Sequence, residues 1–172
     1  YGSVMSNNSK SGKLSKSYRI AIIGGTGKEG RGLAYRWGLA GHELTIGSRA
    51  IEKAQIAADE INNLLPEGVG RVVGLENIQA GDWAEIVVFT VPFSAHISML
   101  EYLKDVIKGK VVIDVSVPLV PPKVTIAQMP AAGSAGKEAQ KVLGEETPVV
   151  IAFQNISYER LINSKDIDCD VL

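Results

Sequence analysis

Cysteine and histidine are scarce in this sequence, and their scarcity removes several classes of site. Among the 172 residues there are one cysteine, Cys169, and two histidines, His42 and His96. A single cysteine forms neither a disulfide framework nor a cysteine-rich metal centre. Neither histidine has a second histidine, a cysteine or a carboxylate at the spacing of metal ligands. We therefore predict no metal site and interpret both histidines as surface or packing residues.

Long apolar runs and an excess of charge are also missing. No apolar stretch reaches the length of a membrane span. The formal net charge is −1, which gives no attraction to nucleic acid or to anionic lipid. The lysines near the N-terminus are not followed by the apolar segment of a signal peptide. We therefore predict a cytoplasmic protein with no nucleic-acid partner and no membrane partner.

Large apolar residues are rare in residues 1–17, which are rich in Ser, Asn, Gly and Lys. Such a segment cannot bury enough surface to offset its ordering entropy, so we predict a disordered N-terminal tail. Residues 1–4 resemble an expression tag, and Met5 is the natural start that we expect. The whole chain is 45% hydrophobic, so residues 18–172 are predicted to form one domain with a substantial core.

Two kinds of apolar pattern alternate along the rest of the chain. Short apolar runs predict strands at 20–23, 43–46, 71–74, 85–91, 111–115 and 148–152, with a further strand beginning at 168. Spacings of three and four predict helices at 28–40 and 50–65, a helix after Phe93, a helix capped by Ser134 and a short helix within 154–163. Strands that alternate with helices predict an α/β fold. We expect a Rossmann-type, doubly wound parallel sheet with strand order 3-2-1-4-5-6.

Glycines follow the first predicted strand in the pattern G-x-G-x-x-G. The pattern consists of Gly25, Gly27 and Gly30, with Lys28 and Glu29 before the last glycine. Gly25 permits the tight turn, Gly27 leaves room for a pyrophosphate, and Gly30 lets helix and strand pack closely. The free N–H groups of the new helix then face the phosphates. The pattern indicates a dinucleotide site, although a strand-to-helix turn without a ligand has the same sequence.

Hydroxyl and basic residues stand where the second predicted strand ends. An NAD site usually has Asp or Glu there, which accepts hydrogen bonds from the ribose 2′-hydroxyl. This chain has Ser48 and Arg49, with Lys53 one helical turn further on and Thr26 in the glycine loop. A hydroxyl and a guanidinium attract a 2′-phosphate, which a carboxylate would repel. We therefore predict NADP rather than NAD. The alternative is that Arg49 and Lys53 are ordinary solvated charges.

Groups that move protons are hard to find in the predicted cleft. A doubly wound sheet binds its ligand outside the carboxyl ends of its strands. Asp114 falls inside a strand pattern, Asp82 falls in a polar turn, and Ser116 lacks the surroundings of a catalytic serine. We predict no catalytic residue, which fits a direct hydride exchange in which the cofactors carry the chemistry.

Five segments of the sequence together resemble a known enzyme family. They are Ile-Ile-Gly-Gly-Thr-Gly-Lys-Glu-Gly-Arg-Gly-Leu-Ala (22–34), Gly-His-Glu-Leu-Thr-Ile-Gly-Ser-Arg (41–49), Val-Pro-Phe (91–93), Val-Pro-Leu-Val-Pro (117–121) and Ala-Phe-Gln-Asn-Ile-Ser (152–157). The sequence closely resembles the NADPH-dependent coenzyme F420 reductases, also called F420H2:NADP oxidoreductases. The resemblance covers residues 18–172. It implies hydride transfer between C4 of the nicotinamide and C5 of the deazaflavin coenzyme F420, with the two rings stacked in the cleft.

The resemblance also implies roles for individual residues. Thr26, Ser48, Arg49 and Lys53 are expected to hold the 2′-phosphate. Val91, Pro92 and Ala152 are expected beside the nicotinamide. The segments 117–119 and 154–156 are expected beside the deazaflavin. The full set of expected cofactor-binding residues is Gly25, Thr26, Gly27, Lys28, Glu29, Gly30, Ser48, Arg49, Lys53, Val91, Pro92, Val117, Pro118, Leu119, Ala152, Gln154, Asn155 and Ile156.

The end of the sequence departs from the family pattern. Family members continue beyond the strand that begins at Asp168 into a small helical part that helps to close the site and to form a homodimer. This chain ends at Leu172, so we expect either a fragment or a shortened relative. Two other functions stay open: another NADP-dependent reductase, acting on a flavin, a metal-bound flavin system or an imine, and a module that binds NADPH without chemistry.

Overall fold

A computed structural model describes residues 16–117, 133–163 and 165–167. Its strands are β1 (Arg19–Ile23), β2 (Glu43–Ser48), β3 (Val72–Glu76), β4 (Ile86–Phe89), β5 (Val111–Asp114) and β6 (Val149–Ile151). Its helices are α1 (Lys28–Leu39), α2 (Ile51–Leu64), α3 (Asn77–Trp83), α4 (Phe93–Leu103), α5 (Ala135–Leu143) and α6 (Tyr158–Leu161). Strands and helices alternate along the chain, as the sequence predicts.

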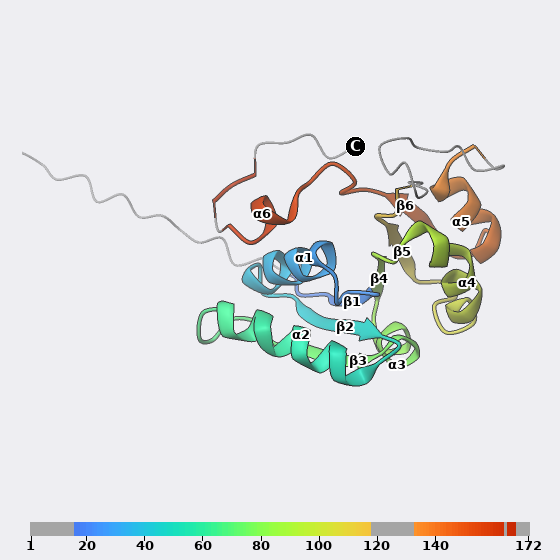
Figure 1. The fold of residues 1–172 in the computed structure, drawn as a ribbon. Helices are drawn as coiled ribbons and strands as arrows, with labels where there is room; N and C mark the ends of the chain where they lie inside the picture. The colour runs from blue at the N-terminus through green and yellow to red at the C-terminus, as the bar shows by residue number, and fades with distance from the viewer. Residues whose placement is uncertain (1–15, 118–132, 164, 168–172) are drawn as a thin grey trace, which may run out of the picture.

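The described strands form one six-stranded sheet in the order β3-β2-β1-β4-β5-β6. Every pair of neighbouring strands in it is parallel. The helices lie on both sides of this sheet, with α1, α2 and α6 on one side and α3, α4 and α5 on the other (Figure 1). This arrangement confirms the predicted Rossmann-type α/β fold and its strand order.

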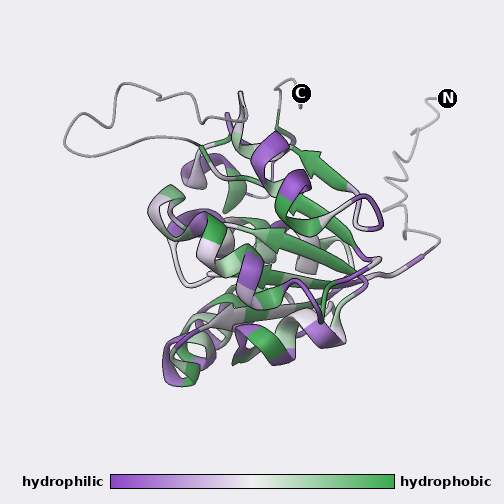
Figure 2. Ribbon diagram, turned by 90° about the vertical axis from the view of Figure 1, so that its right-hand side faces the viewer, coloured by the Kyte–Doolittle hydropathy of each residue, from purple (hydrophilic) through white to green (hydrophobic). Residues whose placement is uncertain are grey.

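Two apolar cores fill the space between the sheet and its helices. The strand residues alternate between them: Ile20 and Ile22 face the α1–α2 side, whereas Ala21 and Ile23 face the α3–α4 side. Both faces of the central strands are therefore apolar, which parallel strands covered on both sides require. Figure 2 shows mostly hydrophobic strands between helices in which hydrophilic and hydrophobic residues alternate.

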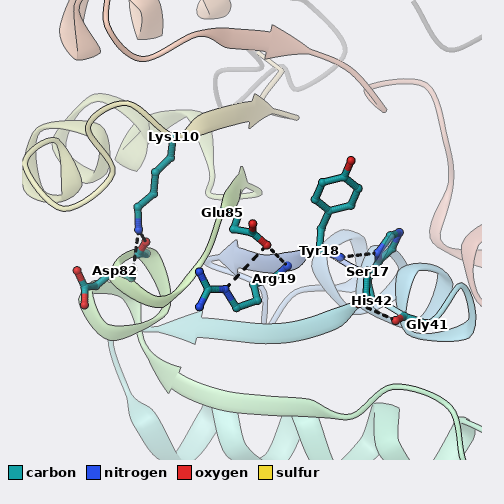
Figure 3. A network of polar contacts seen from close by, with 9 residues as sticks. Ser17, Tyr18, Arg19, Gly41, His42, Asp82, Glu85 and Lys110 are labelled. Carbon is teal, nitrogen blue, oxygen red and sulfur yellow. Dashed lines mark hydrogen bonds and ion pairs between the residues drawn. The ribbon is translucent and has the colours of Figure 1, made fainter. Parts of the chain in front are cut away.

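Polar groups close the amino ends of the strands (Figure 3). The hydroxyl of Ser17 donates to the carbonyl of Gly41 at 2.9 Å, and the N–H of Tyr18 donates to Nδ1 of His42 at 3.2 Å. The N–H of Arg19 donates to Oε2 of Glu85 at 3.0 Å. Burial lowers the pKa of the His42 imidazole, so the neutral ring that accepts this bond is favoured.

Helix α3 is the element that the sequence interpretation missed. We predicted no helix between the third and fourth strands and placed Asp82 in a polar turn. That prediction is wrong, because Asp82 lies in α3. The helix begins with a capping box formed by Glu76 and Gln79, and Nζ of Lys110 donates to the carbonyls of Gly81 and Asp82 near its C-terminus at 2.7 and 2.6 Å. Interactions at both ends stabilise a helix too short to show a clear period.

Several predictions fall outside the described residues. These are the disordered character predicted for residues 1–15, the deazaflavin contacts expected at Pro118 and Leu119, and the strand expected to begin at 168. In the described part, no helix is both long enough and apolar enough to cross a membrane.

Candidate functional site

The glycine loop between β1 and α1 lies at the centre of the carboxyl edge of the sheet. β1 pairs with β2 on one side and with β4 on the other, so the winding direction reverses here and a crevice opens outside the strand ends. The loop is held by two hydrogen bonds. The N–H of Gly25 donates to the carbonyl of Gly47 at 3.1 Å, and the N–H of Gly24 donates to Oδ1 of Asn77 at 3.3 Å.

The glycines of the loop have different physical roles. The tight turn that we assigned to Gly25 belongs to Gly24, which has a φ of +67° in the left-handed region. Gly25 is needed for space, because a Cβ there would lie 2.8 Å from the carbonyl oxygen of Ile22. A Cβ on Gly30 would lie 2.5 Å from Cα of Gly25, so Gly30 lets α1 pack closely against the turn that follows β1, rather than against the strand itself as we predicted.

Gly27 faces open space. A Cβ on Gly27 would meet no described heavy atom within 4 Å, so a side chain here would project into open space rather than into the core. Gly27 is also the N-cap of α1 and makes no side-chain cap. The first N–H groups of α1 are therefore left for a bound acceptor or for water.

A cavity of about 470 Å³ lies beside this loop. Four of the residues expected to hold a 2′-phosphate line it together: Thr26 from the loop, Ser48 from the end of β2, Arg49, and Lys53 from the first turn of α2. The hydroxyl oxygen of Ser48 is nearly buried and accepts the N–H of Ala50 at 3.2 Å, which fixes the start of α2. The structure thus brings together residues that are 27 positions apart in the sequence, from Thr26 to Lys53.

The two cations of this cavity have no anionic partner in the described part of the chain. Arg49 and Lys53 are both exposed, and neither forms an ion pair with a described carboxylate. Other basic residues do form such pairs, including Arg31 with Glu60, and Lys108 with Glu146 at 2.7 Å. The cavity therefore presents uncompensated positive charge at the end of β2, which suits a dianionic phosphate.

A second cavity, of about 440 Å³, continues from the first. Both are lined by Ser48, Arg49, Asn77, Ala95 and Met99. The second is extended by Glu76 at the end of β3 and by Ser98 and Tyr102 on α4. It is therefore a mixed polar and apolar extension of the crevice, on the side away from the glycine loop.

A third cavity, of about 370 Å³, continues from the first in the other direction. It shares Val91 and Pro92 with the first, and its other lining residues are Glu29, Thr90, Phe93, Val115, Ser116, Val117, Phe153 and Gln154. The three cavities together make a trough along the carboxyl ends of the strands.

A buried pair supports the floor of the third cavity. Nε2 of His96 on α4 lies 2.8 Å from Oδ2 of Asp114 at the end of β5, and both side chains are at most 1% exposed. The other carboxylate oxygen, Oδ1 of Asp114, accepts the N–H of Ser116 at 3.0 Å. The carbonyl of Ser116 in turn accepts from Nε2 of Gln154 at 3.1 Å. The pair thus fixes the loop that carries three of the cavity's lining residues, Val115, Ser116 and Val117.

Phe153 has the backbone conformation that is least expected. Its φ is +64°, and it is the one non-glycine residue with a positive φ in the described ranges. Such a conformation costs about 1–3 kcal/mol and persists only where the surroundings fix it. The ring of Phe153 packs edge-on against Trp37 of α1, with centroids 5.6 Å apart. This contact holds the start of the segment that carries Gln154 in place over the cavity.

Nine of the expected site residues line the trough, and seven of those described do not. Ala152 and Ile156 are buried, and Ile156 packs in the core on the α1–α2 side. The others outside the lining of the three cavities are Gly25, Gly27, Lys28, Gly30 and Asn155. Pro118 and Leu119 lie outside the described residues.

Sequence reasoning also missed residues that the structure brings to the trough. Asn77, Met99 and Tyr102 line it, and the pairing of His96 with Asp114 supports it. The Glu-x-x-Gln capping box at 76–79 was a usable signal for α3, and therefore for Asn77 at its first position. No comparable signal marked the histidine and the aspartate, which are 18 residues apart.

Comparison with known sequences identifies close relatives. A family described as "NADP oxidoreductase coenzyme F420-dependent" matches residues 19–118. The F420-dependent NADP reductase of Methanothermobacter marburgensis is 40% identical over 160 residues, which cover 90% of this chain and 71% of that protein. The F420-dependent NADP reductase of Methanocaldococcus jannaschii is 38% identical with the same coverage.

Solved structures give a consistent result. A crystal structure from Arthrobacter sp. FB24, provisionally described as an F420-dependent NADP reductase, superimposes with a TM-score of 0.64 at 28% identity. The match covers 83% of this chain and 65% of that one, so this chain spans slightly less than two thirds of the solved protein. A pyrroline-5-carboxylate reductase from Coxiella burnetii matches with a TM-score of 0.56 at 20% identity, covering 80% and 44% of the two chains. The latter similarity shows the fold alone.

Proposed function

Because this chain belongs to the family of coenzyme F420-dependent NADP oxidoreductases, we propose that it transfers a hydride between NADP(H) and coenzyme F420. When bound, the two cofactors would supply the redox chemistry, with C4 of the nicotinamide and C5 of the deazaflavin as donor and acceptor. The contribution of the protein is to bind, orient and enclose them. The single observation that carries the proposal is the trough along the carboxyl edge, with unpaired cations in one of its cavities.

Arg49 and Lys53 are the proposed ligands of the NADP 2′-phosphate. Both line the first cavity without an anionic partner among the described residues. The guanidinium of Arg49 can bind two phosphate oxygens at once, whereas the ammonium of Lys53 acts as a point charge. Thr26, from the glycine loop, adds a hydroxyl to the lining of the same cavity. The absence of a carboxylate at the end of β2 supports NADP over NAD.

The glycine loop is the proposed pyrophosphate site. The residues fit the group, because Gly27 leaves open space where a side chain would stand and the first N–H groups of α1 are not capped by a side chain. The second cavity, which Asn77 and Tyr102 line, is then the proposed binding site of the adenine end of the nucleotide. The third cavity, beyond Val91 and Pro92, is the proposed binding site of the nicotinamide and the deazaflavin.

Alignment is the proposed catalytic contribution of the third cavity. Direct hydride transfer needs the reacting carbons about 3–3.5 Å apart. Val91 and Pro92 form an apolar wall, and Ser116 and Gln154 are tied to each other across the pocket. We assign no acid or base for the transfer itself. We propose instead that the peptide and side-chain groups around Ser116 and Gln154 hold substituents of the rings and exclude water.

A direct absorbance assay tests this function. Purified protein is mixed with NADPH and oxidised F420, and loss of the deazaflavin absorbance band is followed beside parallel samples with FMN or with NADH. We expect reduction of F420 by NADPH and little reaction in either control. Reduction of FMN alone would favour a flavin reductase. Binding of NADPH without reduction of any acceptor would favour a nucleotide-binding module without chemistry.

The same family membership supports three further proposals, on the domain, the location in the cell and the oligomeric state. Residues 18–172 are proposed to form one NADP-binding domain, the protein is proposed to act in the cytoplasm, and it is proposed to form a homodimer when the family's C-terminal part is present. Size-exclusion chromatography with light scattering, applied to this chain and to a chain extended to the length of its relatives, tests the last proposal.

A further inference from the structure

Glu29 is an acidic residue in an unusual place. It is the second residue of α1, and it lines the third cavity with Val91, Pro92 and Phe153. Its Oε1 atom is buried and has no hydrogen-bond partner among the described residues. Buried carboxylate oxygens in proteins normally have a partner, so an orphaned one that lines a cavity needs an explanation.

Support of the helix is the ordinary explanation for an acid in the first turn. Such a carboxylate usually accepts free N–H groups or interacts with the helix dipole. Oε1 of Glu29 accepts none of those N–H groups, since no donor reaches it within the described chain. Because Glu29 also lines the third cavity, we look for its role in whatever occupies that cavity.

The position of Glu29 along the trough identifies that occupant. Arg49 and Lys53 line the first cavity, which continues past Val91 and Pro92 into the cavity that Glu29 lines. A dinucleotide with its 2′-phosphate at the cations and its pyrophosphate at the glycine loop extends its nicotinamide toward Val91 and Pro92. The nicotinamide ring is positively charged in NADP+ and neutral in NADPH, so a nearby carboxyl group senses the difference.

We propose that Glu29 sets the preference of the cleft between oxidised and reduced nicotinamide: the carboxylate favours NADP+, and the protonated acid favours NADPH. This inference rests on the proposed function. Binding of NADP+ to the protonated site releases the proton to solvent, and binding of NADPH to the ionised site takes one up from solvent. The balance of the two affinities therefore depends on pH.

The surroundings of Glu29 support this role. Burial raises the pKa of its carboxyl above the ordinary value of 4.5, and no neighbouring charge contributes to the rise. The ionisable groups within three positions of the cavity's lining residues are Lys28, Arg31, His96 and Asp114.

None of these four groups neutralises Glu29. His96 and Asp114 hold each other at 2.8 Å. Arg31 donates to the carbonyl of Thr26 at 2.9 Å and pairs with Glu60, and Lys28 is exposed. Glu29 is therefore the titratable group among the described residues that line this cavity.

The sign of the pH dependence follows from the charges. The positive ring of NADP+ lowers the pKa of Glu29, so the affinity for NADP+ rises as pH rises through the pKa of the free protein. The neutral ring of NADPH only desolvates the carboxyl, which raises its pKa, so the affinity for NADPH falls over the same range. The ratio of the dissociation constants, NADP+ over NADPH, therefore falls as pH rises.

Binding titrations test the proposal without any turnover. The dissociation constants of NADP+ and NADPH are measured by calorimetry from about pH 5 to about pH 8, for the wild type, Glu29→Gln and Glu43→Gln. Ionisation of the 2′-phosphate affects both nucleotides equally and cancels in the ratio. Glu43 is the matched control, because it is an exposed glutamate at the amino end of β2, away from the trough. Glutamine keeps the size of glutamate and cannot titrate.

We expect the ratio to change about tenfold or more in the wild type and in Glu43→Gln, which corresponds to a pKa difference of about one unit. In Glu29→Gln the ratio should be constant. A constant ratio in the wild type, or an unchanged slope in Glu29→Gln, overturns this inference alone. If the folded wild type binds neither nucleotide, the proposed function fails, and this inference fails with it.

Discussion

The two ends of the parallel sheet differ in how their polar groups are satisfied. At the amino end, Ser17, the N–H groups of Tyr18 and Arg19, and Lys110 each have a hydrogen-bond partner in the described chain (Figure 3). At the carboxyl end, Arg49 and Lys53 have no anionic partner and an oxygen of Glu29 has no donor, again within the described residues. The groups named at the first end have partners within the chain, whereas those named at the second end are charges that a ligand would satisfy.

This difference follows from the topology. All described neighbouring strands are parallel, so every strand delivers its following loop to the same edge. The opposite edge receives only the segments that enter strands, and their polar groups serve to fix the fold. A ligand site therefore adds unpaired charge at one end without weakening the other. Substitutions of the same chemical type at the two ends should consequently affect different properties.

Gly27→Val should have the largest effect on binding. Gly27 has a φ of −78°, and its Cβ direction is open, so a valine strains neither backbone nor core and instead fills the proposed pyrophosphate site. We expect NADPH affinity to fall by about 100-fold or more, which is about 2.7 kcal/mol, with little change in stability. NADP+ should be affected equally. Fluorescence titration and thermal unfolding measure the two effects.

Gly41→Val is the matched change near the amino end. A Cβ on Gly41 also meets nothing within 4 Å, but its φ is +89°, so a valine there is strained. It should cost about 1–3 kcal/mol of stability and leave nucleotide affinity unchanged. Equal NADPH affinity in wild type and Gly27→Val would show that the nucleotide does not bind against the glycine loop.

Arg49→Ala should have the next largest effect, and it should be selective. Loss of a hydrogen bond to a charged group weakens NADPH binding by about 1.5–3 kcal/mol. NADH lacks the 2′-phosphate, so its affinity should hardly change. Arg19→Ala, at the amino end, removes the same group from an exposed ion pair with Glu85 and should change neither affinity. Equal losses for NADPH and NADH in Arg49→Ala would assign Arg49 to the shared part of the nucleotide.

Asp114→Ala should lower stability rather than the rate of hydride transfer. The substitution leaves Nε2 of buried His96 and the N–H of Ser116 without their acceptors. Each unsatisfied buried group costs about 1–3 kcal/mol, which urea unfolding would detect. In folded protein we expect the transfer rate to stay within about tenfold of the wild type. A loss of about 10²–10⁴-fold in single-turnover measurements would instead identify a general acid or base.

The fold was predictable because its rules are local and repetitive. Alternating apolar runs and helical spacings placed all the described strands in a parallel sheet of the right order. Helix α3 escaped prediction because its seven residues, which include Asn77, Gly81 and Asp82, carry little periodicity. The tight turn was assigned to the wrong member of two adjacent glycines, since the G-x-G-x-x-G pattern does not say which residue has the positive φ.

The site was predictable where one strand end supplies several residues. Ser48 ends a single strand and Arg49 and Lys53 follow it, so their sequence positions alone bring them to one cavity with Thr26. Asn77 and the pair of His96 with Asp114 depend on which elements become neighbours across the sheet. Contacts of this kind are set by tertiary packing. The capping box at 76–79 could have indicated the helix that carries Asn77, but no pattern in the sequence indicated which elements these side chains would contact.

Glu29→Gln and Glu85→Gln should give the smallest effects, with opposite signs. Burial raises the pKa of Glu29 above its ordinary value of 4.5. At a pH between the two pKa values, the carboxyl group is therefore protonated in the folded protein and ionised in the unfolded chain. The folded state therefore loses stability relative to the unfolded state as pH rises toward the folded pKa. Glutamine avoids this penalty, so Glu29→Gln should be more stable than the wild type near neutral pH, by less than about 1 kcal/mol because the side chain remains partly hydrated.

The comparison with Glu85 makes this last prediction specific to the site. Glu85 pairs with Arg19 at the amino end at 3.9 Å, and both side chains are about half exposed. Glu85→Gln loses that ion pair and should be less stable than the wild type, by no more than about 0.5 kcal/mol. Urea unfolding at about pH 7 and about pH 5 measures both variants, and the advantage of Glu29→Gln should shrink at the lower pH. A stability loss in Glu29→Gln at both pH values would mean that its carboxylate stabilises the fold, as the charges at the amino end do.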